Sequence, residues 1–370
     1  MRVLTEVNSL DPLGGIELST LQDSVALQRR NHQIEVLYGE EGSMRSQFSD
    51  AGIALHGPVS LAFETRHPII GMEKLIKPAR WTRSQNFDLF WLQRFEHVVS
   101  AQAISRWSRI PIVCHLHQRP NVSRVSVFGY GVAHYVATSN FIKNMWADSG
   151  LSADRISVVH NSIPYEEYPF GGDDALAKSR QNLGIPGDAR VVLLYGSMIE
   201  SKGVGTLLEA WRHVQRECDD AILLLVGSPS PLENPTFTQR LQQLDAGNIR
   251  WFPMQSNVIE FLHASDLVAF PTWLQEGFGR VVIEGLASGR PVISSEVGAV
   301  PEILTDPMDR FLVSARKPRE LADRILEYIQ WRRLDPTLGV RCTDWVRRKF
   351  PHERHIEELE SVLTRFGRAR

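Results

Sequence analysis

The sequence predicts an α/β protein composed of two doubly wound domains, each built on a parallel sheet. Short apolar runs with the composition of strands alternate with amphipathic stretches through most of the chain. At 370 residues the chain is too long for one ordinary core, so two domains are expected. The stretch Phe170-Gly171-Gly172-Asp173-Asp174 interrupts the alternation near the middle. Because ligands bind beyond the carboxyl ends of the strands in such sheets, we expect a cleft between the two domains.

The first domain is expected over residues 1–168. Its helix, Glu17 to Arg29, follows a turn formed by Gly14-Gly15. Its strands are recognised by short apolar runs bounded by turn residues. They are expected at Arg2–Val7, Gln33–Tyr38, Leu89–Leu92, Pro111–Leu116 and His134–Ala137.

The second domain is expected over residues 169–349. Its strands are expected at Val191–Tyr195, Ala221–Val226, Ile249–Phe252, Leu267–Phe270 and Pro291–Ser294. Its helices are expected at Val204–Glu217, Thr236–Asp245, Val258–His263, Gly279–Ala287 and Pro301–Leu304. A final helix, about His352 to Phe366 within residues 350–370, has no strand after it. We expect this helix to pack back on the first domain.

Composition and charge are those of a soluble globular protein, with 43% apolar and 23% charged residues and a formal net charge of −2. The longest purely apolar run, Ala221–Val226, is far too short to span a bilayer. The N-terminus has the pattern of a strand rather than of a secretion signal. Three cysteines, Cys114, Cys218 and Cys342, form no close pair, which argues against a disulfide framework and a zinc site. We therefore expect a cytoplasmic protein.

Basic side chains are most frequent near the end of the chain, where residues 316–370 hold 14 basic and 9 acidic residues. The two kinds of charge are interleaved at helical spacing, which favours a solvated helix face over an anion-binding surface. Nothing in this pattern indicates nucleic acid as a partner.

Two glutamates eight positions apart form the most informative motif. Glu276 lies in the Glu276-Gly277-Phe278-Gly279 loop between a strand and a helix, and Glu284 lies inside that helix among apolar residues. A buried carboxylate requires hydrogen-bond donors, and a ligand with several hydroxyls would supply them. The glycines allow a ligand to approach the backbone closely, and the helix N-terminus offers N–H groups to a phosphate. For the glycines alone, a tight strand-to-helix turn is the alternative.

A second loop, Tyr195 to Gly203, also connects a strand to a helix. Lys202 lies just before the first helical turn, where an ammonium group is unfavourable unless an anion is near. A surface lysine is the alternative. In the first domain Gly14-Gly15 occupies the corresponding place. Its spacing differs from Gly-x-Gly-x-x-Gly, so a nicotinamide cofactor is not favoured.

Two histidines, His115 and His117, end an apolar strand. Strand alternation places both on one face, at the carboxyl end of the sheet. Either ring could donate a hydrogen bond into the cleft. The alternatives are satisfied histidines at a strand edge, for at least one of them, and a metal pair, which lacks a nearby third ligand.

In this order along one chain, these residues resemble the retaining glycosyltransferases with the GT-B fold, the group called family 4. The most specific part is the Glu-x7-Glu segment with its Phe278-Gly279 and the trailing Ser288-Gly289-Arg290-Pro291. Weaker matches extend the resemblance over nearly the whole chain. They are Gly14-Gly15-Ile16-Glu17, Asn31–Val36, His117, Val136–Ser139, Ile156–Ile163, Lys202-Gly203, Leu225–Gly227 and Glu296–Glu302.

The resemblance implies two Rossmann-like domains that face each other across a cleft, and it implies a role for each site residue. Glu284 would accept hydrogen bonds from the ribose of a nucleoside diphosphate sugar, and Glu276 would hold hydroxyls of the transferred sugar. Lys202 would bind the diphosphate together with backbone N–H groups of the loop residues Gly277, Phe278 and Gly279.

The implied reaction transfers a hexosyl group from a UDP- or GDP-hexose of glucose or mannose type to an acceptor hydroxyl, with retention of configuration. His117 would face the reacting sugar, and Gly14-Gly15 would let the first domain approach the phosphates or the acceptor. The acceptor class is a glycan, a lipid-linked saccharide or a small glycoside. The sequence has no Asp-x-Asp motif for a divalent cation, so no metal and no further cofactor is expected.

The chain departs from the family pattern at three positions. Ser197 is expected in the donor site, where members commonly carry an arginine that binds the diphosphate. A serine offers only a neutral hydrogen bond, so either the leaving group is stabilised less or another cation, with Arg280 as a candidate, takes its place. Ser162 and Ala299 replace two usual glycines.

Two alternatives to this function stay open. One is another nucleotide-sugar enzyme on the same fold, such as an epimerase or a disaccharide synthase. The other is a non-catalytic partner subunit, which only the replacement at Ser197 favours.

A basic and apolar stretch bears on the acceptor. Residues 66–83 contain five basic side chains among apolar ones, with Glu73 as the only acid. Such a stretch is compatible with peripheral contact at the inner face of a membrane and with an anionic lipid-linked acceptor. An ordinary amphipathic surface helix is the alternative.

Overall fold

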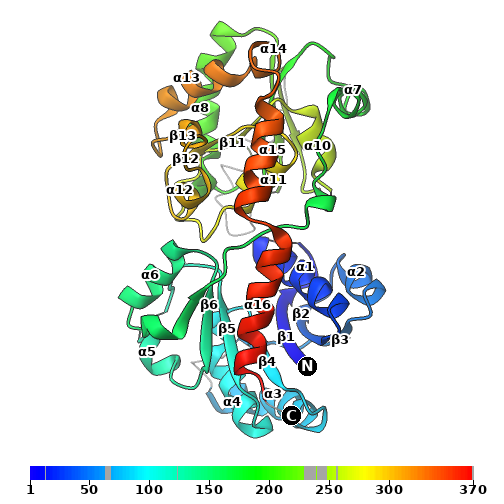
Figure 1. The fold of residues 1–370 in the computed structure, drawn as a ribbon, viewed down its shortest axis with the longest axis vertical. Coiled ribbons are helices and arrows are strands. Elements are labelled where there is room, and N and C mark those ends of the chain that lie inside the picture. Colours follow the sequence, from blue (N-terminus) through cyan, green and yellow to red (C-terminus); the bar gives the residue numbers. More distant parts are fainter. Residues whose placement is uncertain are drawn as a thin grey trace. The chain divides into compact units, whose positions relative to one another are not determined.

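The chain folds into two α/β units, each with its own parallel sheet (Figure 1). The computed structural model describes residues 1–12, 14–62, 68–122, 124–228, 239, 248–255 and 257–368, and only the backbone of residues 68–72. The first unit comprises Met1–Asn161 and Glu353–Arg370, and the second comprises Ser162–His352. The expected helix at Thr236–Asp245 lies outside the described residues, apart from Gln239.

The first unit contains a seven-stranded sheet in the order β3-β2-β1-β4-β5-β6-β7, and all of its strand pairs are parallel. The central strands are buried on both faces, as expected for a parallel sheet covered by helices. The strands are β1 Arg2–Ser9, β2 Gln33–Glu40, β3 Ala54–His56, β4 Leu89–Leu92, β5 Ile112–Leu116, β6 His134–Ala137 and β7 Ile156–Val158.

The helices of the first unit connect successive strands, except for the last one. They are α1 Gly15–Arg29, α2 Arg45–Asp50, α3 Pro68–Ser84, α4 Val98–Ser108, α5 Val125–Phe128, α6 Asn140–Asp148 and α16 His352–Phe366, with short 3₁₀ turns at Phe95–His97 and Ala153–Arg155.

The C-terminal helix α16 belongs to the core of the first unit (Figure 1). Its apolar side chains Ile356, Leu359 and Leu363 lie in one cluster with side chains of β1 and β2. A buried polar contact adds to this packing: His355 Nε2 lies 3.0 Å from Asp23 Oδ1 on α1, and His355 Nδ1 lies 2.8 Å from the His160 carbonyl oxygen.

The second unit contains a six-stranded sheet in the order β10-β9-β8-β11-β12-β13, again with parallel pairs only. Its strands are β8 Arg190–Tyr195, β9 Ala221–Val226, β10 Ile249–Phe252, β11 Leu267–Phe270, β12 Val292–Ser295 and β13 Leu312–Val313. The described helices are α7 Asp173–Asn182, α8 Val204–Glu217, α10 Ile259–Ala264, α11 Arg280–Ala287, α12 Val300–Ile303, α13 Pro318–Tyr328, α14 Trp331–Leu334 and α15 Leu338–Lys349, with 3₁₀ turns at Tyr165–Glu167, Glu200–Lys202 and Asp309–Phe311.

All ten predicted strands are confirmed, with ends that differ by at most two residues. Three strands were missed, namely β3, β7 and β13. Each of them is only two or three residues long and lies at an edge of its sheet. Such short strands carry too few residues for an alternating pattern, and pairing with one neighbour decides their conformation.

The first and last segments of the second unit are hydrogen-bonded to each other. Ser162 Oγ donates to the Phe350 carbonyl at 2.7 Å, and the Tyr165 hydroxyl lies 2.9 Å from the same oxygen and 3.0 Å from the Val346 carbonyl. The serine that replaces the family's usual glycine at this position therefore contributes a side-chain hydrogen bond.

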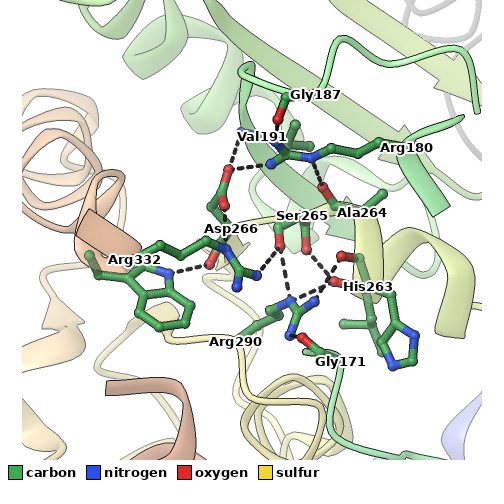
Figure 2. Close-up of polar contacts among 12 residues, drawn as sticks. Gly171, Arg180, Gly187, Val191, His263, Ala264, Ser265, Asp266, Arg290 and Arg332 are labelled. Carbon is green, nitrogen blue, oxygen red and sulfur yellow. Dashed lines mark hydrogen bonds and ion pairs between the residues drawn. The ribbon is translucent and has the colours of Figure 1, made fainter. Parts of the chain in front are cut away.

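A cluster of three arginines around one aspartate stabilises the second unit (Figure 2). Asp266 accepts from Arg180 at 2.8 Å and from Arg332 at 2.7 Å. Arg290 is fully buried, and among the described residues its partners are all backbone carbonyls, including that of Gly171 at 2.8 Å. Burial and the neighbouring Arg332 lower the pKa of Arg290 to about 9. Because Arg290 follows α11, the cluster fixes the end of the helix that carries Glu284.

None of the helices in the described part of the chain combines the length and the apolar composition needed to cross a bilayer.

Candidate functional site

Two neighbouring strands bring the predicted residues of the second unit together. β8 pairs with β11 in parallel, with Val192 opposite Leu267. The loops that follow these strands therefore leave the same edge of the sheet. The first loop carries Ser197 and Lys202, and the second carries Glu276.

Lys202 and Glu276 form an ion pair in which Nζ lies 2.6 Å from Oε1. Thr272 Oγ1 lies 3.1 Å from the same carboxylate oxygen. The two charged side chains keep 24% and 13% of their surface exposed, so both remain accessible to a ligand. Gly203 allows the two loops to lie this close together. Its φ is +81°, and a Cβ there would lie 2.0 Å from the Pro271 carbonyl oxygen. Only glycine fits this turn.

The backbone of Glu276 is held from the other side by the turn before α12. Ala299 N donates to the Glu276 carbonyl at 3.0 Å. Gly298 has a φ of +58°, and a Cβ there would lie 2.4 Å from the same oxygen. Ala299 has a φ of −86°, which any residue adopts. The departure from a second glycine at residue 299 is therefore compatible with the loop.

Glu284 is 5% exposed on α11, and protein groups bind both of its carboxylate oxygens. Arg280 Nε donates to Oε1 at 3.1 Å, and the Tyr195 hydroxyl donates to Oε2 at 2.8 Å. The expectation that a ligand must supply the donors was incomplete, because two side chains already do so. Burial, together with the Glu284 carboxylate, raises the pKa of the Tyr195 hydroxyl well above its usual range.

The remaining predicted donor-site residues of the second unit lie on the same two loops. Ser197 and Gly277 are half-buried, and Phe278 is buried with its ring edge-to-face against Phe350. Gly279 has a φ of +103° and is the N-cap of α11, with no side-chain cap. The backbone N–H groups of the first turn of α11 follow directly on this glycine.

In the first unit, His117 belongs to a chain of polar side chains that connects the ends of β4 and β5 to Thr5 inside β1. His117 Nε2 lies 3.0 Å from Gln93 Oε1, Gln93 Nε2 donates to Thr5 Oγ1 at 2.9 Å, and the Thr5 hydroxyl donates to the Trp91 carbonyl at 2.8 Å. A small open pocket lies beside this chain and is lined by His117, Gln93 and Arg94, among others.

His115 lies next to His117, with the ring centroids 4.1 Å apart, as strand alternation predicted. It is 1% exposed, and neither ring nitrogen has a hydrogen-bond partner among the described residues. Burial lowers the pKa of His115 far below its usual range, which keeps the ring neutral. Of the two histidines, only His117 fits the alternative of a satisfied side chain.

Gly14 and Gly15 begin α1, with Gly14 as the N-cap, and both are exposed. The backbone at Gly14 is extended, with a φ of −166°. A Cβ there would lie 3.5 Å from Glu17 Oε2, an ordinary contact. Nothing described within the first unit therefore requires glycine at residue 14.

Within the described ranges, no group of three or more histidine, cysteine or acidic side chains is arranged to hold a metal ion.

Three residues of these sites were missed in the sequence: Tyr195, Thr272 and Gln93. Each is the last residue of a strand or lies within two residues of its end. Tyr195 and Gln93 contact residues far away in the sequence, and Thr272 contacts a residue in the following loop. The contact between Arg280 and Glu284, in contrast, has the four-residue spacing of a helical ion pair and could have been recognised.

Two family models match the chain, one in each half. Residues 13–167 match the model described as "Glycosyltransferase Family 4". Residues 189–330 match the model described as "Glycosyl transferases group 1".

Relatives and solved structures agree with these models. A D-inositol 3-phosphate glycosyltransferase of Corynebacterium glutamicum is 34% identical over 197 residues, which cover 51% of this chain and 47% of the relative. The chain thus spans about half the length of this relative. A phosphatidyl-myo-inositol mannosyltransferase of Mycobacterium leprae is 26% identical over 344 residues, 87% of this chain and 85% of the relative. The structure of HepE from Anabaena in complex with UDP and glucose superposes with a TM-score of 0.85 at 20% identity, over 98% of this chain and 99% of the other, and shows the same fold.

Proposed function

Because the chain belongs to the group 1 glycosyltransferases of family 4 and has their GT-B fold, we propose that it transfers a hexosyl group from a nucleoside diphosphate sugar to an acceptor hydroxyl, with retention of configuration. The observation that carries this proposal is the pair of carboxylates after β11. Glu276 is paired with Lys202 in the loop, and Glu284 is held by donors on α11.

The proposed donor site assigns one part of the nucleotide sugar to each group. Glu284 accepts hydrogen bonds from the ribose, Glu276 holds hydroxyls of the sugar, and Lys202 binds the diphosphate together with the N–H groups of residues 277–279. Ser197 adds a neutral hydrogen bond. An ammonium group and a helix N-terminus are preorganised donors for the charge that develops on the departing diphosphate.

In the proposed reaction, the bond between the anomeric carbon and the phosphate oxygen breaks while the acceptor oxygen bonds to the same carbon on the same face. The departing phosphate oxygen takes the proton of the acceptor hydroxyl. His117 is assigned a place facing the sugar, and Gly14-Gly15 a place near the phosphates or the acceptor. Both assignments rest on the family resemblance. We propose that no divalent metal takes part.

The donor and the acceptor are proposed as classes. The likeness to a structure that contains UDP and glucose, and to a relative named as a mannosyltransferase, supports a UDP- or GDP-hexose. Relatives that carry inositol in their names support an acceptor with several hydroxyls, either a saccharide, a glycoside or a lipid-linked form of these.

Peripheral contact with a membrane stays a separate proposal. On α3 the side chains of Leu75 and Ala79 are buried, Lys77 and Arg80 are exposed, and Ile76 is 41% exposed. Over residues 73–84, this pattern is that of an amphipathic surface helix that exposes an apolar side chain, Ile76, beside its basic ones. Sedimentation with anionic liposomes tests it: a protein that stays in the supernatant would contradict membrane contact.

The proposed function is tested with a screen of UDP, GDP and their glucose and mannose derivatives by thermal shift. A donor at 100 times its dissociation constant should stabilise the protein by about 2.7 kcal/mol. Donors that bind are then incubated with mono- and disaccharide acceptors, with and without EDTA, and the products are identified by mass spectrometry. Nucleotide release that requires an acceptor supports a transferase. Binding without turnover would instead support a partner subunit, the alternative that Ser197 favours.

A further inference from the structure

We propose that Tyr195 and Arg280 are positioning residues for Glu284, and that together they set the preference of the site for ribonucleotides over deoxyribonucleotides. This inference rests on the proposed function, in which Glu284 binds the ribose of the donor.

The geometry leaves Glu284 with room for two further hydrogen bonds. An ionised carboxylate has about four lone-pair positions, two on each oxygen. Arg280 Nε occupies one position on Oε1 at 3.1 Å, and the Tyr195 hydroxyl occupies one on Oε2 at 2.8 Å. With respect to the described residues, one acceptor position on each oxygen remains. Two neighbouring hydroxyls, such as the 2′ and 3′ hydroxyls of ribose, match this pair of acceptors.

The two donors differ in how they hold the carboxylate. A guanidinium can only donate, so Arg280 fixes Oε1 as an acceptor. The side chains of Arg280 and Glu284 are 9% and 7% exposed, so water competes little for this contact. The Tyr195 hydroxyl has a single proton and lies closer to Glu284 Oε2, at 2.8 Å, than to the Val281 carbonyl, at 3.4 Å. The hydroxyl therefore donates its proton to the Glu284 carboxylate.

The backbone brings the three side chains together from two elements. Tyr195 is the last residue of β8, while Arg280 and Glu284 lie four residues apart on the first turns of α11. The contact thus connects the edge of the sheet to the helix. A carboxylate fixed from two directions loses little rotamer freedom when a ligand binds, and such preorganisation increases affinity.

Arg280 has a second conceivable role as the cation that replaces the arginine missing at Ser197. In that role it would leave Glu284 and bind the diphosphate. The ion pair with Glu284 favours the positioning role, and the two roles predict different ligand dependence. Loss of a positioning residue changes the discrimination between ribo- and deoxyribonucleotides. Loss of a side chain that binds the diphosphate lowers the affinity for both kinds of nucleotide equally.

The test measures dissociation constants of the full chain for UDP and 2′-deoxy-UDP, and for GDP and 2′-deoxy-GDP, by calorimetry. Tyr195→Phe and Arg280→Gln are compared with wild type. Hydrogen bonds to a charged group contribute about 1.5–3 kcal/mol, so wild type should prefer the ribonucleotide by about tenfold or more. In both variants this preference should fall to within about threefold of unity, with Arg280→Lys intermediate.

Matched controls separate positioning from general damage. Tyr328→Phe removes a tyrosine hydroxyl elsewhere in the second unit, and Arg319→Gln breaks an ion pair of the same four-residue spacing on α13, with an Nε–Oδ1 distance of 3.1 Å. Both controls should keep the wild-type preference. An unchanged preference in Tyr195→Phe overturns the inference for Tyr195. If Arg280→Gln loses equal affinity for the ribo- and the deoxyribonucleotide, the inference is overturned for Arg280, and that side chain is assigned to the diphosphate. If wild type binds none of the nucleotides, the proposed function itself fails, and this inference fails with it.

Discussion

Lys202 and Glu276 form one ion pair, although we assign them to different parts of the donor. The Nζ–Oε1 distance of 2.6 Å means that each group holds the other in place before a ligand arrives. A diphosphate carries more charge than one carboxylate, so it competes for the ammonium group, while Thr272 stays within hydrogen-bond distance of Glu276. At the scale of single residues, we therefore propose that the ion pair holds both side chains in place until ligand groups replace each one's contact with the other.

The first prediction follows from this pair. Lys202→Ala should lower the transfer rate by about 100-fold or more, because it removes the cation beside the developing charge of the leaving group. The protein should stay folded, since a partly exposed ion pair contributes only about 1 kcal/mol or less. Steady-state kinetics and thermal melting measure the two effects. The exposed Lys178→Ala on α7 serves as the control. A Lys202 variant with wild-type kcat would contradict the assigned role.

The second prediction concerns Glu284, whose removal affects stability as well as function. Glu284→Ala leaves the buried guanidinium of Arg280 without its carboxylate, which should cost about 3 kcal/mol or more. Glu284→Gln keeps the shape and one acceptor oxygen, so it should cost less stability while it weakens nucleotide binding about tenfold or more. Melting temperatures and nucleotide titrations of both variants measure this. Equal stability of the two variants would contradict a contribution from the hydrogen bonds that a neutral glutamine can still accept from Arg280 and Tyr195.

The candidate site was predicted in part, and single residues explain where prediction stopped. Glu276 and Lys202 were recognisable because they lie in strand-to-helix loops, and Glu284 because it follows Glu276 by eight positions on the next helix. Tyr195 was not, since its partner Glu284 lies 89 positions further along the chain and meets it only through the pairing of β8 with β11. The hydrogen bond from Ser162 to Phe350, across 188 positions, was hidden for the same reason.

At the scale of elements, the central strands were easier to predict than the edge strands β3, β7 and β13. The central strands β1, β4, β8 and β11 are buried on both faces, so their apolar runs are continuous. The edge strands β3, β7 and β13 lack such runs. The predicted sites needed only the central strands, because the site loops follow β4, β5, β8 and β11. The predicted site residues could therefore be placed on these loops although the edge strands β3, β7 and β13 were missed.

The third prediction uses two glycines near the start of α8. Gly203 has a φ of +81°, and an added Cβ would lie 2.0 Å from the Pro271 carbonyl oxygen, whereas no atom lies within 4 Å of a Cβ added at Gly205. Gly203→Ala should destabilise the protein by about 1–3 kcal/mol and displace Lys202. Gly205→Ala lies inside the helix and should stabilise it by about 0.5–1 kcal/mol. Chemical denaturation of both variants measures these opposite signs; a loss of equal size in both would contradict the account of the turn.

The fourth prediction concerns the pH dependence of the contact between α16 and α1. The His160 carbonyl can only accept, so His355 Nδ1 carries a proton, and Nε2 donates to Asp23. Burial disfavours the charged ring, but the Asp23 carboxylate outweighs it and raises the pKa of His355 above its usual value of 6.5. A raised pKa gives stability that is fully present below pH 6.5 and is lost as the pH rises through the folded pKa. His355→Gln should therefore destabilise the protein more at pH 6 than at pH 9.

A second histidine, His134, should change the stability with pH in the opposite direction. His134 stacks on Phe366 of α16, and burial lowers its pKa to about 4. The unfolded chain then binds a proton between pH 6.5 and 4 that the folded chain does not, so stability falls as the pH decreases through this range. His134→Gln should lose less stability than wild type between pH 7 and pH 5. Melting temperatures of wild type and of both variants between pH 5 and pH 9 measure the two effects. Parallel curves for the variants and wild type would contradict both assignments.

At the scale of the whole molecule, the order of the chain makes the first unit depend on its last residues. The chain leaves the first unit at Asn161, forms the second unit, and returns with α16. The second unit holds the two connecting segments together through the Phe350 carbonyl, which accepts from Ser162 and lies 2.9 Å from the Tyr165 hydroxyl. The first unit therefore cannot complete its core until the second has been synthesised.

The fifth prediction tests this dependence with a chain that ends at Pro351. Without α16, the apolar surface that receives Ile356, Leu359 and Leu363 is exposed, and the contact of His355 with Asp23 is lost. Each fully buried aliphatic side chain contributes about 1.5–3 kcal/mol, so the loss should be about 5 kcal/mol or more, comparable to the stability of an entire domain. The shortened chain should lose the cooperative melting of the first unit, while nucleotide binding, assigned to the second unit, should be retained.

Limited proteolysis of the shortened chain would show which unit has lost its structure. A protected first unit in the shortened chain would show that α16 is dispensable, and proteolysis of both units would show that the second unit also requires it.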